Sequence, residues 1–555
     1  MDERQQIGEY LSKRLAELGV RHIFARGGDD SPGIYDLLGR SAALKVINTR
    51  DEQGAGFAAD AYARTKGLGA VYVASGPGAL KIVNTTALAS AEKSPVIVIS
   101  GTASFEEQGR QQLGNRQSNA LGMQKRIFEE FTVAATVIDS AETALAEIDR
   151  VLAAALRYQR PVYIELPSDL ASGLCPSRHK PLIDKELSDP DTLQEAIDET
   201  TGLINAARRP VILAGVEIRR FNLQKELCQL AGKTGIPVAT TLLAKSVIAD
   251  TEKFSMGMYG QAIGLDKARS SIESSDCLLF LGTFVAGPHS GFATTEIKPN
   301  ASLYATAECI SIGPKRFENI LFHDFIKGLI KAPISPRKLE GIPRPRAPRP
   351  FLHGAEGEMV TVAHLLQQIN ALMDDQTLIV ADLGGTLIAA ADLFIRHTGT
   401  FLSTALSASP GFAVPAALGA QLANPTLRPV VLVTDEAFQM TGMETSTIAR
   451  YGLNPIIIVL NTQGYATGPS LVDAPYPWHF SKIPSVLGKG IGFIVATEIE
   501  LEQALLTAKK NTESFTIIDV MLDRHAHNRL RKKLGKHGQI AKPGKRPPAT
   551  GKKQD

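Results

Sequence analysis

The feature that most constrains the fold is a repeated alternation of short apolar runs with longer amphipathic segments. Runs rich in Val and Ile, such as those at 96–100, 210–214 and 456–460, are each followed at once by Gly or Asn. Such runs are typical of strands buried on both faces, and their alternation with helical patterns is typical of parallel α/β domains. Because one core stops growing at about 250–300 residues, a chain of 555 residues with this pattern predicts several such domains.

The alternation falls into three stretches, and the first and third are similar in pattern. Between the second and third lies KAPISPRKLEGIPRPRAPRPFL, in which Pro and Arg alternate. Such a segment cannot form a helix or a central strand, so we expect an extended linker on the surface. The predicted fold class is therefore α/β with three parallel-sheet domains, divided as follows: a first domain at 1–175, a middle domain at 190–330, the linker at 331–354, a third domain at 355–523 and a basic tail at 524–555.

Positive charge is concentrated at the C-terminus. Residues 524–555 include eleven Lys or Arg and one Asp, a net charge of +10 against +3 overall, so the rest of the chain carries −7. The tail is rich in Pro and Gly and lacks apolar periodicity, which is typical of disordered segments. We expect a solvated tail rather than a nucleic-acid contact, because nothing in it is suited to reading bases.

No segment is expected to span a membrane. The longest apolar runs are far shorter than the roughly 20 residues that a spanning helix needs. Near the N-terminus, Ile7, Leu11, Leu15 and Leu18 have helical spacing, which predicts an amphipathic helix rather than a signal peptide. The four cysteines show no CxxC spacing, so neither a zinc site nor a disulfide framework is predicted. We expect a soluble, cytoplasmic protein.

The segment most informative about function is TRDEQGAGFAADAYAR at 49–64. Here Glu52 follows a predicted strand and begins a helix whose first turns are mostly Gly and Ala. Small residues permit the close approach of another helix or a ligand. Taken alone, a glutamate at a helix start is explained well enough by the helix dipole. A functional interpretation therefore depends on the other motifs of the chain.

Those motifs resemble thiamine-diphosphate enzymes of the pyruvate and indolepyruvate decarboxylase and acetolactate synthase type. In that family the glutamate precedes AGYAADGYAR, and here Glu52 precedes AGFAADAYAR in the same register. The resemblance covers nearly all of 1–523 and implies a pyrimidine-binding, a middle and a diphosphate-binding domain. Further similar segments follow in the family's order, namely SGPGALKIVN, SPVIVISG and RPVYIELP in the first domain and SPGFAVPAALGAQLA, VVLVTDEAFQMT and IIIVLNTQGY in the third.

The resemblance assigns Glu52 a catalytic role. In the family, the cofactor supplies a carbanion that adds to a carbonyl and then serves as an electron sink. Its formation requires a carboxyl group that hydrogen-bonds a nitrogen of the pyrimidine ring, and Glu52 would be that group. Such a carboxyl works best when it is buried with a raised pKa, which the apolar, small-residue surround of this segment would favour.

The resemblance also implies a site for the diphosphate and Mg²⁺, which prefers hard oxygen ligands. By position, Asp435, Thr462 and Gly464 would bind the metal. Gly384, Gly385 and Thr386 would meet the phosphates through backbone N–H groups and a hydroxyl. The family pattern further places Pro410, Glu436, Ala437 and Tyr465 against the cofactor.

Several residues depart from the family pattern. The two glycines that flank the metal-binding aspartate are replaced by Thr434 and Glu436, and Thr462 stands in place of a ligand asparagine. Glycine allows backbone to approach phosphate, and Glu436 adds negative charge near an anionic group. Pro410 replaces the large aliphatic residue that supports the bent cofactor. These changes leave the strength of cofactor binding open.

The acid–base groups of the decarboxylases are only partly present. Asp29 aligns with their catalytic aspartate, whereas Arg110 and Gln111 replace their histidine pair and Gly468 replaces a late glutamate. Neither Arg nor Gln exchanges protons readily near neutral pH. His479 is an alternative acid, although an unremarkable surface or core histidine is the better expectation.

Three functions stay open on these observations. The first is a thiamine-diphosphate-dependent, non-oxidative 2-oxo acid decarboxylase; the second is an acetolactate synthase-like carboligase, which the missing proton donors favour. The third is a cofactor-deficient family member with a binding or regulatory role. The presence of Glu52, Asp29 and Asp435 favours an enzyme. By resemblance we also expect a homodimer or homotetramer, in which the first domain of one subunit and the third of another enclose a cofactor.

Overall fold

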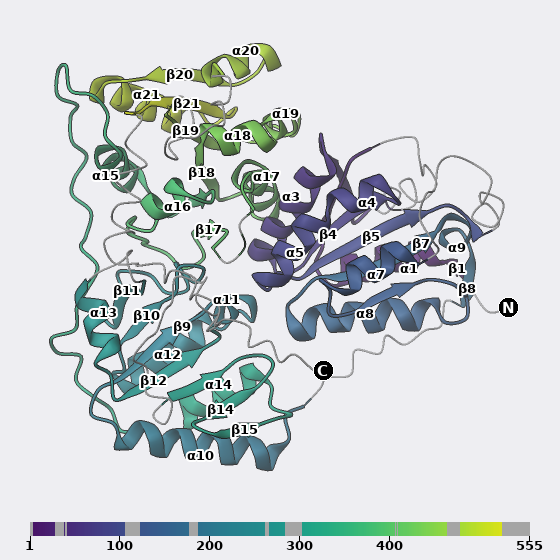
Figure 1. Cartoon of the computed structure of the whole chain (residues 1–555), viewed down its shortest axis with the longest axis horizontal. Coiled ribbons are helices and arrows are strands. Elements are labelled where there is room, and N and C mark those ends of the chain that lie inside the picture. Colours follow the sequence, from purple (N-terminus) through teal and green to yellow (C-terminus); the bar gives the residue numbers. More distant parts are fainter. Residues whose placement is uncertain are drawn as a thin grey trace, which may run out of the picture.

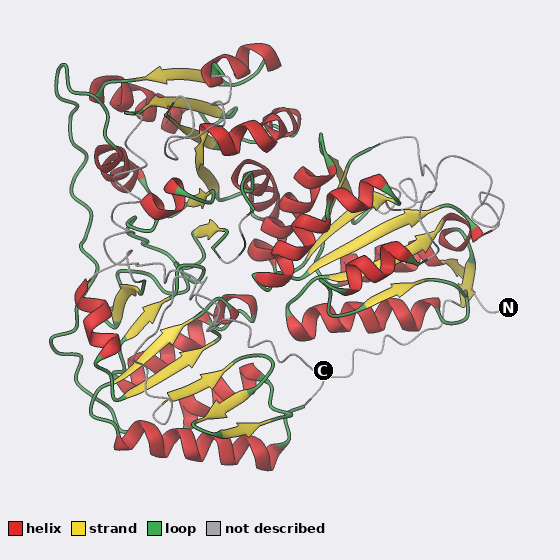
Figure 2. Cartoon of the chain, viewed as in Figure 1, coloured by secondary structure: helices red, strands yellow, loops and turns green. Residues whose placement is uncertain are grey.

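The computed structural model describes residues 4–27, 38, 42–105, 122–176, 187–260, 266–283, 302–405, 407, 409–462 and 478–523. Its described strands form three large sheets and one two-stranded antiparallel pair, β1 (Arg4–Gln6) with β8 (Leu174–Pro176). The three sheets occupy three separate parts of the molecule (Figure 1), and helices lie against both faces of each sheet (Figure 2). None of the helices in these ranges is long and apolar enough to cross a bilayer.

The first sheet is parallel throughout, in the order β3-β2-β4-β5-β7-β6. The amphipathic helix predicted near the N-terminus is α1, which buries Ile7, Leu11 and Leu15 completely. The elements of this part are β2 (His22–Ala25), β3 (Lys45–Asn48), β4 (Gly69–Ala74), β5 (Val96–Thr102), β6 (Ala135–Val137), β7 (Val162–Pro167), α1 (Ile7–Glu17), α3 (Glu52–Lys66), α4 (Pro77–Lys81), α5 (Val83–Ala91), α7 (Met123–Glu129), α8 (Ala144–Tyr158) and α9 (Ser168–Ala171).

The middle sheet has five parallel strands in the order β11-β10-β9-β12-β13, extended by the antiparallel β14 and β15. Its core is formed by apolar residues of these strands and their helices. The elements are β9 (Pro210–Ala214), β10 (Val238–Thr240), β11 (Ser255–Met258), β12 (Cys277–Leu281), β13 (Ser302–Ala305), β14 (Ile310–Ile312), β15 (Lys315–Phe317), α10 (Pro190–Ala206), α11 (Glu217–Arg220), α12 (Gln224–Thr234), α13 (Asp266–Glu273) and α14 (Phe322–Lys331).

The third sheet, β17-β16-β18-β19-β21-β20, is parallel and has the same topology as the first. Numbered along the chain, both sheets have the order 2-1-3-4-6-5, so the similarity seen in sequence extends to the strand connections. The elements are β16 (Thr377–Ala381), β17 (Phe401–Ser403), β18 (Arg428–Thr434), β19 (Ile456–Asn461), β20 (Ile491–Val495), β21 (Thr516–Met521), α15 (Val362–Leu372), α16 (Gly385–Ala390), α17 (Ala413–Ala423), α18 (Asp435–Thr441), η3 (Gly442–Glu444), α19 (Thr445–Arg450), η4 (Phe480–Lys482), α20 (Ile483–Leu487) and α21 (Glu498–Lys510).

The Pro/Arg-rich linker connects the middle and third parts without regular structure. From Ala332 to the start of α15, the chain forms one isolated bridge, between Met359 and Thr497. It runs along the left edge of the molecule in Figure 1. This agrees with the expected extended surface linker, because Pro removes the donors and backbone freedom that helices and central strands need.

Helices α3 and α17 join the first and third parts, and their axes can approach because the contact is made of small residues. Both helices belong to one continuous core with strands of both sheets. A Cβ atom added to Gly419 on α17 would lie 1.9 Å from the carbonyl oxygen of Ala58 on α3. A glycine is therefore required at this crossing for the backbones to come this close.

Gly419→Ala is expected to destabilise the protein by about 1–3 kcal/mol, because the added methyl group must separate the two helices. The shift of the urea or thermal unfolding midpoint measures this effect. Gly202→Ala in α10 is the matched control, since a Cβ there meets no atom within 4 Å. An unchanged midpoint for Gly419→Ala would contradict the close crossing.

Buried ion pairs also join the three parts. Lys93, which follows α5, pairs with Glu217 at the start of α11, and both side chains are buried. Arg64 on α3 pairs with Asp60 and Glu92. Arg64 also donates to the carbonyl oxygen of Ser403 in the third part, at 2.8 Å. These contacts fix the first part of the chain relative to the middle part through Lys93 and to the third part through Arg64.

Candidate active site

The segments expected to bind the diphosphate lie together at the carboxyl edge of the third sheet. Strands β16, β18 and β19 are adjacent, and the predicted segments directly follow them. Chain order reverses between β16 and β18, and in open α/β sheets ligands bind outside the carboxyl ends of strands at such a point. The topology therefore places these segments where a ligand site is expected.

Asp435 and Thr462 are in direct contact. The Oδ2 atom of Asp435 accepts a hydrogen bond from the backbone N–H of Thr462 at 3.1 Å, and Oδ1 accepts one from Glu436 at 3.0 Å. Asp435 is the first residue of α18 and is 8% exposed. Two residues that are 27 positions apart in sequence thus meet in one buried, oxygen-rich cluster.

Thr434 has taken over a structural role in place of the family's glycine. Its backbone is extended, with φ −77° and ψ 158°, so this position does not require glycine for its conformation. Its hydroxyl oxygen caps α18 by accepting the N–H of Ala437 at 3.1 Å. The Ala437 N–H is therefore already satisfied within the protein. Glu436 is half-buried on the first turn of the same helix.

The turn after β16 presents open backbone. Gly384 has φ +99° and ψ −140°, and a Cβ added there would meet no atom of the described residues within 4 Å. Gly385 begins α16, and Thr386 is fully buried one residue further along. The hydroxyl of Thr386 donates to the carbonyl oxygen of Asp382 at 2.8 Å. The Thr386 hydroxyl is thus already engaged within the turn, whereas the Cβ side of Gly384 is open among the described residues.

Asp382 is an organising residue that sequence reasoning missed. Its carboxylate accepts the backbone N–H groups of Leu383 at 2.8 Å, Gly411 at 3.0 Å and Ala413 at 2.8 Å. Burial raises the pKa of Asp382 to about 6, although these hydrogen bonds oppose the shift. The contacts hold the turn after β16 against the loop that contains the half-buried Pro410. An aspartate directly after an apolar strand was the available signal.

Asp519 on β21 is a second missed residue. It is buried and accepts a hydrogen bond from the side-chain amide of Asn461 at 2.9 Å. Burial raises its pKa, and the negative charge of nearby Asp435 acts in the same direction. The signal was a charged residue inside an otherwise apolar strand, FTIIDVML. His479 is exposed, as the plainer sequence interpretation expected.

Glu52 begins α3, near the carboxyl edge of the first sheet. Its side chain is 9% exposed and forms ion pairs with Lys81 at 2.9 Å and Arg26 at 3.3 Å. The neighbouring Asp51 caps the helix by accepting the N–H of Gln53. The expected apolar surround is therefore incomplete: small residues lie on the helix side, and two cations contact the carboxylate.

Glu444 connects this helix start to the third part of the chain. Its Oε1 atom accepts the backbone N–H groups of Arg50 at 2.9 Å and Asp51 at 3.1 Å, and burial raises its pKa. Glu444 ends η3, whereas Asp435 begins α18, nine residues earlier. The two helices are separated at Thr441, whose backbone is not helical, with φ −136° and ψ 1°. Within one chain, Glu52 thus lies near the end of this helical segment that is opposite to Asp435.

Four predicted site residues lie outside the described residues: Asp29, Gln111, Gly464 and Tyr465. The basic tail at 524–555 also lies outside them. Among the residues that the structure describes, no group of three or more His, Cys, Asp or Glu side chains is arranged to hold a metal. Any metal held at Asp435 would therefore depend on oxygen ligands of other kinds.

Comparison with known proteins identifies the class. Residues 5–123 match the N-terminal TPP-binding domain of thiamine pyrophosphate enzymes, 197–316 match their central domain, and 382–520 match their C-terminal TPP-binding domain. The chain belongs to the thiamine pyrophosphate (thiamine diphosphate) enzyme family. All three domains of the family are present in their usual order.

Individual relatives are similar over almost their whole length. An indole-3-pyruvate decarboxylase of Azospirillum brasilense is 30% identical over 533 residues, covering 94% of this chain and 96% of the relative. A protein named "Probable pyruvate decarboxylase" from Schizosaccharomyces pombe is 30% identical, with 93% of each chain covered. An alpha-keto-acid decarboxylase of Mycolicibacterium paratuberculosis is also 30% identical, covering 93% of this chain and 94% of the relative.

Proposed function

We propose that the protein is a thiamine-diphosphate-dependent, non-oxidative 2-oxo acid decarboxylase. The observation that carries the proposal is the contact of Asp435 with Thr462 beside the open turn at Gly384, at the strand-order reversal of the third sheet. The names of the full-length relatives, all of them decarboxylases of 2-oxo acids, support the same reaction.

The residues present fit a diphosphate held through Mg²⁺. In proteins, Mg²⁺ is commonly bound by one or two carboxylates together with substrate phosphates and waters. Asp435 would supply the carboxylate and Thr462 a further oxygen, while the open backbone at Gly384 would receive phosphate oxygens. Thr434 does not obstruct this arrangement through its backbone, because its conformation is ordinary for a non-glycine residue.

When bound, the cofactor supplies the carbanion that attacks the substrate carbonyl and accepts the electrons released with CO₂. Glu52 would hold a proton between its carboxylate and the cofactor ring. To make that contact, it would give up its ion pair with Lys81 or with Arg26. Both cations are about half exposed, with 50% and 52% of their side chains accessible, so they can be displaced into water at little cost. Glu444 and Asp51 fix the helix start that positions Glu52.

We further propose that the site is completed by a second copy of the chain. Within one chain Glu52 and Asp435 lie near opposite ends of the α18–η3 segment. On this same segment Met440 and Met443 are exposed, at 52% and 43%, which suits an apolar subunit interface. The four cysteines are free thiols, in keeping with the proposed cytoplasmic location.

The first test is calorimetric titration of the purified protein with thiamine diphosphate, with and without Mg²⁺. Saturable, metal-dependent binding is expected, followed by CO₂ release from at least one member of a series of aliphatic and aromatic 2-oxo acids. Coupled products without net aldehyde release would indicate a carboligase instead. Absence of binding at high cofactor concentration would contradict the proposal and favour a cofactor-deficient, regulatory role.

Asp435→Ala is expected to weaken cofactor binding at least about tenfold in the presence of Mg²⁺, because a charged metal ligand is lost. The same calorimetric titration measures the change. Glu513→Gln, an exposed acidic residue of the same domain, serves as the control and should bind as the parent does. If the parent binds equally well with EDTA and with Mg²⁺, Asp435 is not a metal ligand.

A further inference from the structure

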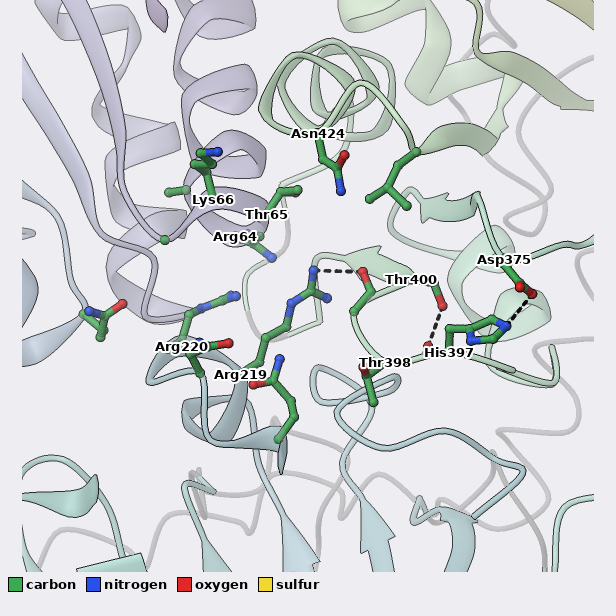
Figure 3. A pocket seen from close by; sticks show the side chains of 17 residues that line it. Arg64, Thr65, Lys66, Arg219, Arg220, Asp375, His397, Thr398, Thr400 and Asn424 are labelled. Atoms are coloured by element: carbon green, nitrogen blue, oxygen red, sulfur yellow. Dashed lines mark hydrogen bonds and ion pairs between the residues drawn. The ribbon is translucent and has the colours of Figure 1, made fainter. Parts of the chain in front are cut away.

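A polar cavity of about 510 Å³ lies where the three parts of the chain meet. It is bounded by the C-terminal end of α3, by α11 with the residues that follow it, and by the segments around 397–400 and 424–427 of the third part. Figure 3 shows Arg64, Arg219 and Arg220 converging on its centre from α3 and α11. A cavity of this volume is within the range of small-molecule sites.

Two of these arginines carry charge that no carboxylate within the described residues pairs directly. Arg219 donates to the carbonyl oxygens of Gly399 and Phe401, both at 3.0 Å. Arg220 likewise donates to backbone carbonyls, those of Glu92 and Lys93. Carbonyl dipoles satisfy hydrogen bonds but do not cancel a full positive charge. Arg64 is different, because Asp60 and Glu92 neutralise it.

The pKa values of Arg219 and Arg220 also indicate a lack of compensating negative charge. Burial lowers the pKa of Arg219 to about 10, and the neighbouring charge of Arg64 adds to the effect. Burial lowers the pKa of Arg220 to about 9, with further contributions from Arg64 and Arg219 that Asp60 and Glu92 only partly offset. Their charged forms are thus under-stabilised in this protein, and a bound anion would relieve that. The exposed Lys66 adds a further cation at the rim.

The rest of the lining is suited to hydroxyl groups. The lining includes the amides of Asn222 and Asn424 and the hydroxyl of Thr398. None of the residues described as lining the cavity is Phe, Tyr or Trp, and the one imidazole among them, that of His397, is paired with Asp375, so the cavity offers little surface on which a nucleobase would stack.

The cavity is separate from the proposed cofactor site. It contacts Asp375 and Leu427, which precede β16 and β18, whereas the cofactor segments follow the same strands. β18 has seven residues and spans about 20 Å or more with its flanks. Arg64 is also twelve residues from Glu52 on α3, which corresponds to about 18 Å.

We propose that this cavity is a binding site for a phosphorylated polyol of sugar-phosphate size. A phosphate monoester carries a charge of roughly −1.5 to −2 at neutral pH, which matches two unpaired guanidinium groups better than a single carboxylate does. Its hydroxyl groups would form hydrogen bonds with the amides of Asn222 and Asn424 and the hydroxyl of Thr398. The site does not depend on the reaction proposed above.

Calorimetric titration tests this site with glucose 6-phosphate, glucose, inorganic phosphate and gluconate as probes, on protein with and without saturating thiamine diphosphate and Mg²⁺. Glucose 6-phosphate is expected to bind at one site per chain in both conditions and more tightly than the other three. Arg219→Gln should weaken it about tenfold or more, because a charge-assisted contact is lost. Lys66→Gln, an exposed change that spares the fold, should weaken it severalfold. Arg316→Gln, at an arginine whose side chain is 61% exposed on β15, should have no effect.

Several results would overturn the proposal. The first is that glucose 6-phosphate does not bind. The second is that Arg219→Gln and Lys66→Gln both bind it as tightly as the parent protein does. The third is competition with thiamine diphosphate, which would place the ligand in the cofactor site. If gluconate binds as tightly as glucose 6-phosphate, the site does not select phosphate. If inorganic phosphate binds as tightly as glucose 6-phosphate, the site does not recognise the polyol. If circular dichroism shows that Arg219→Gln is misfolded, Lys66→Gln decides the matter. A protein that binds glucose 6-phosphate but not the cofactor would support this site while contradicting the proposed reaction.

Discussion

Glu52→Gln is expected to slow CO₂ release from 2-oxo acids by at least about 100-fold, the usual scale for loss of a catalytic proton-transfer group. Glutamine keeps the size and a hydrogen-bonding oxygen of the side chain but cannot hold the proton at the cofactor ring. The fold should be unaffected, because Lys81 and Arg26 are half exposed and remain hydrated when the carboxylate is lost.

Steady-state rates measured at saturating cofactor test this prediction, with calorimetry to show that the variant still binds thiamine diphosphate. Glu129→Gln is a suitable control, since Glu129 lies in the same domain and, among the described residues, forms a surface ion pair with Lys125. Activity of the Glu52 variant within a few-fold of the parent would refute the catalytic role. A variant that loses cofactor binding altogether would make Glu52 a binding residue instead.

Arg64→Met is expected to give the largest loss of stability, about 3–5 kcal/mol, the usual cost of removing one partner from a buried ion pair. Arg64 is 1% exposed, and its partners Asp60 and Glu92 are fully buried. Burial by itself lowers the pKa of Arg64, yet the charges of these two partners outweigh it and hold the pKa above its usual value. Methionine would remove the buried cation that pairs with both of these carboxylates.

The effect should appear as a lower midpoint of urea unfolding, followed by circular dichroism and by the fluorescence of Trp478. Adding Glu92→Gln to Arg64→Met should restore part of the loss, because one of the two buried charges that Arg64 neutralises is removed. Arg316→Gln on the surface is the control and should unfold as the parent does. A midpoint of Arg64→Met equal to that of the parent would mean that the network contributes nothing to stability.

Local patterns were sufficient to determine the class of fold. Apolar runs of five to seven residues predicted the central strands, such as β5 and β19, because strands buried on both faces need continuous apolar sequence. Helical spacing predicted that Ile7, Leu11 and Leu15 would be buried in α1. The order of the motifs around Glu52 and Asp435 was enough to indicate the family. All of these signals lie within a few residues of one another in the chain.

Only the tertiary structure decided the contacts between distant segments. Glu444 accepts backbone N–H groups just before α3, almost 400 positions earlier in the chain, and Lys93 in the first part pairs with Glu217 in the middle part. No local sequence pattern predicts either contact, because the sequence does not distinguish a charged residue that will be buried from one that will be exposed. The unpaired arginines beside the cavity were hidden for the same reason. What a side chain does is set by the partners that folding brings to it, and those partners are specified by the packing of whole sheets and helices.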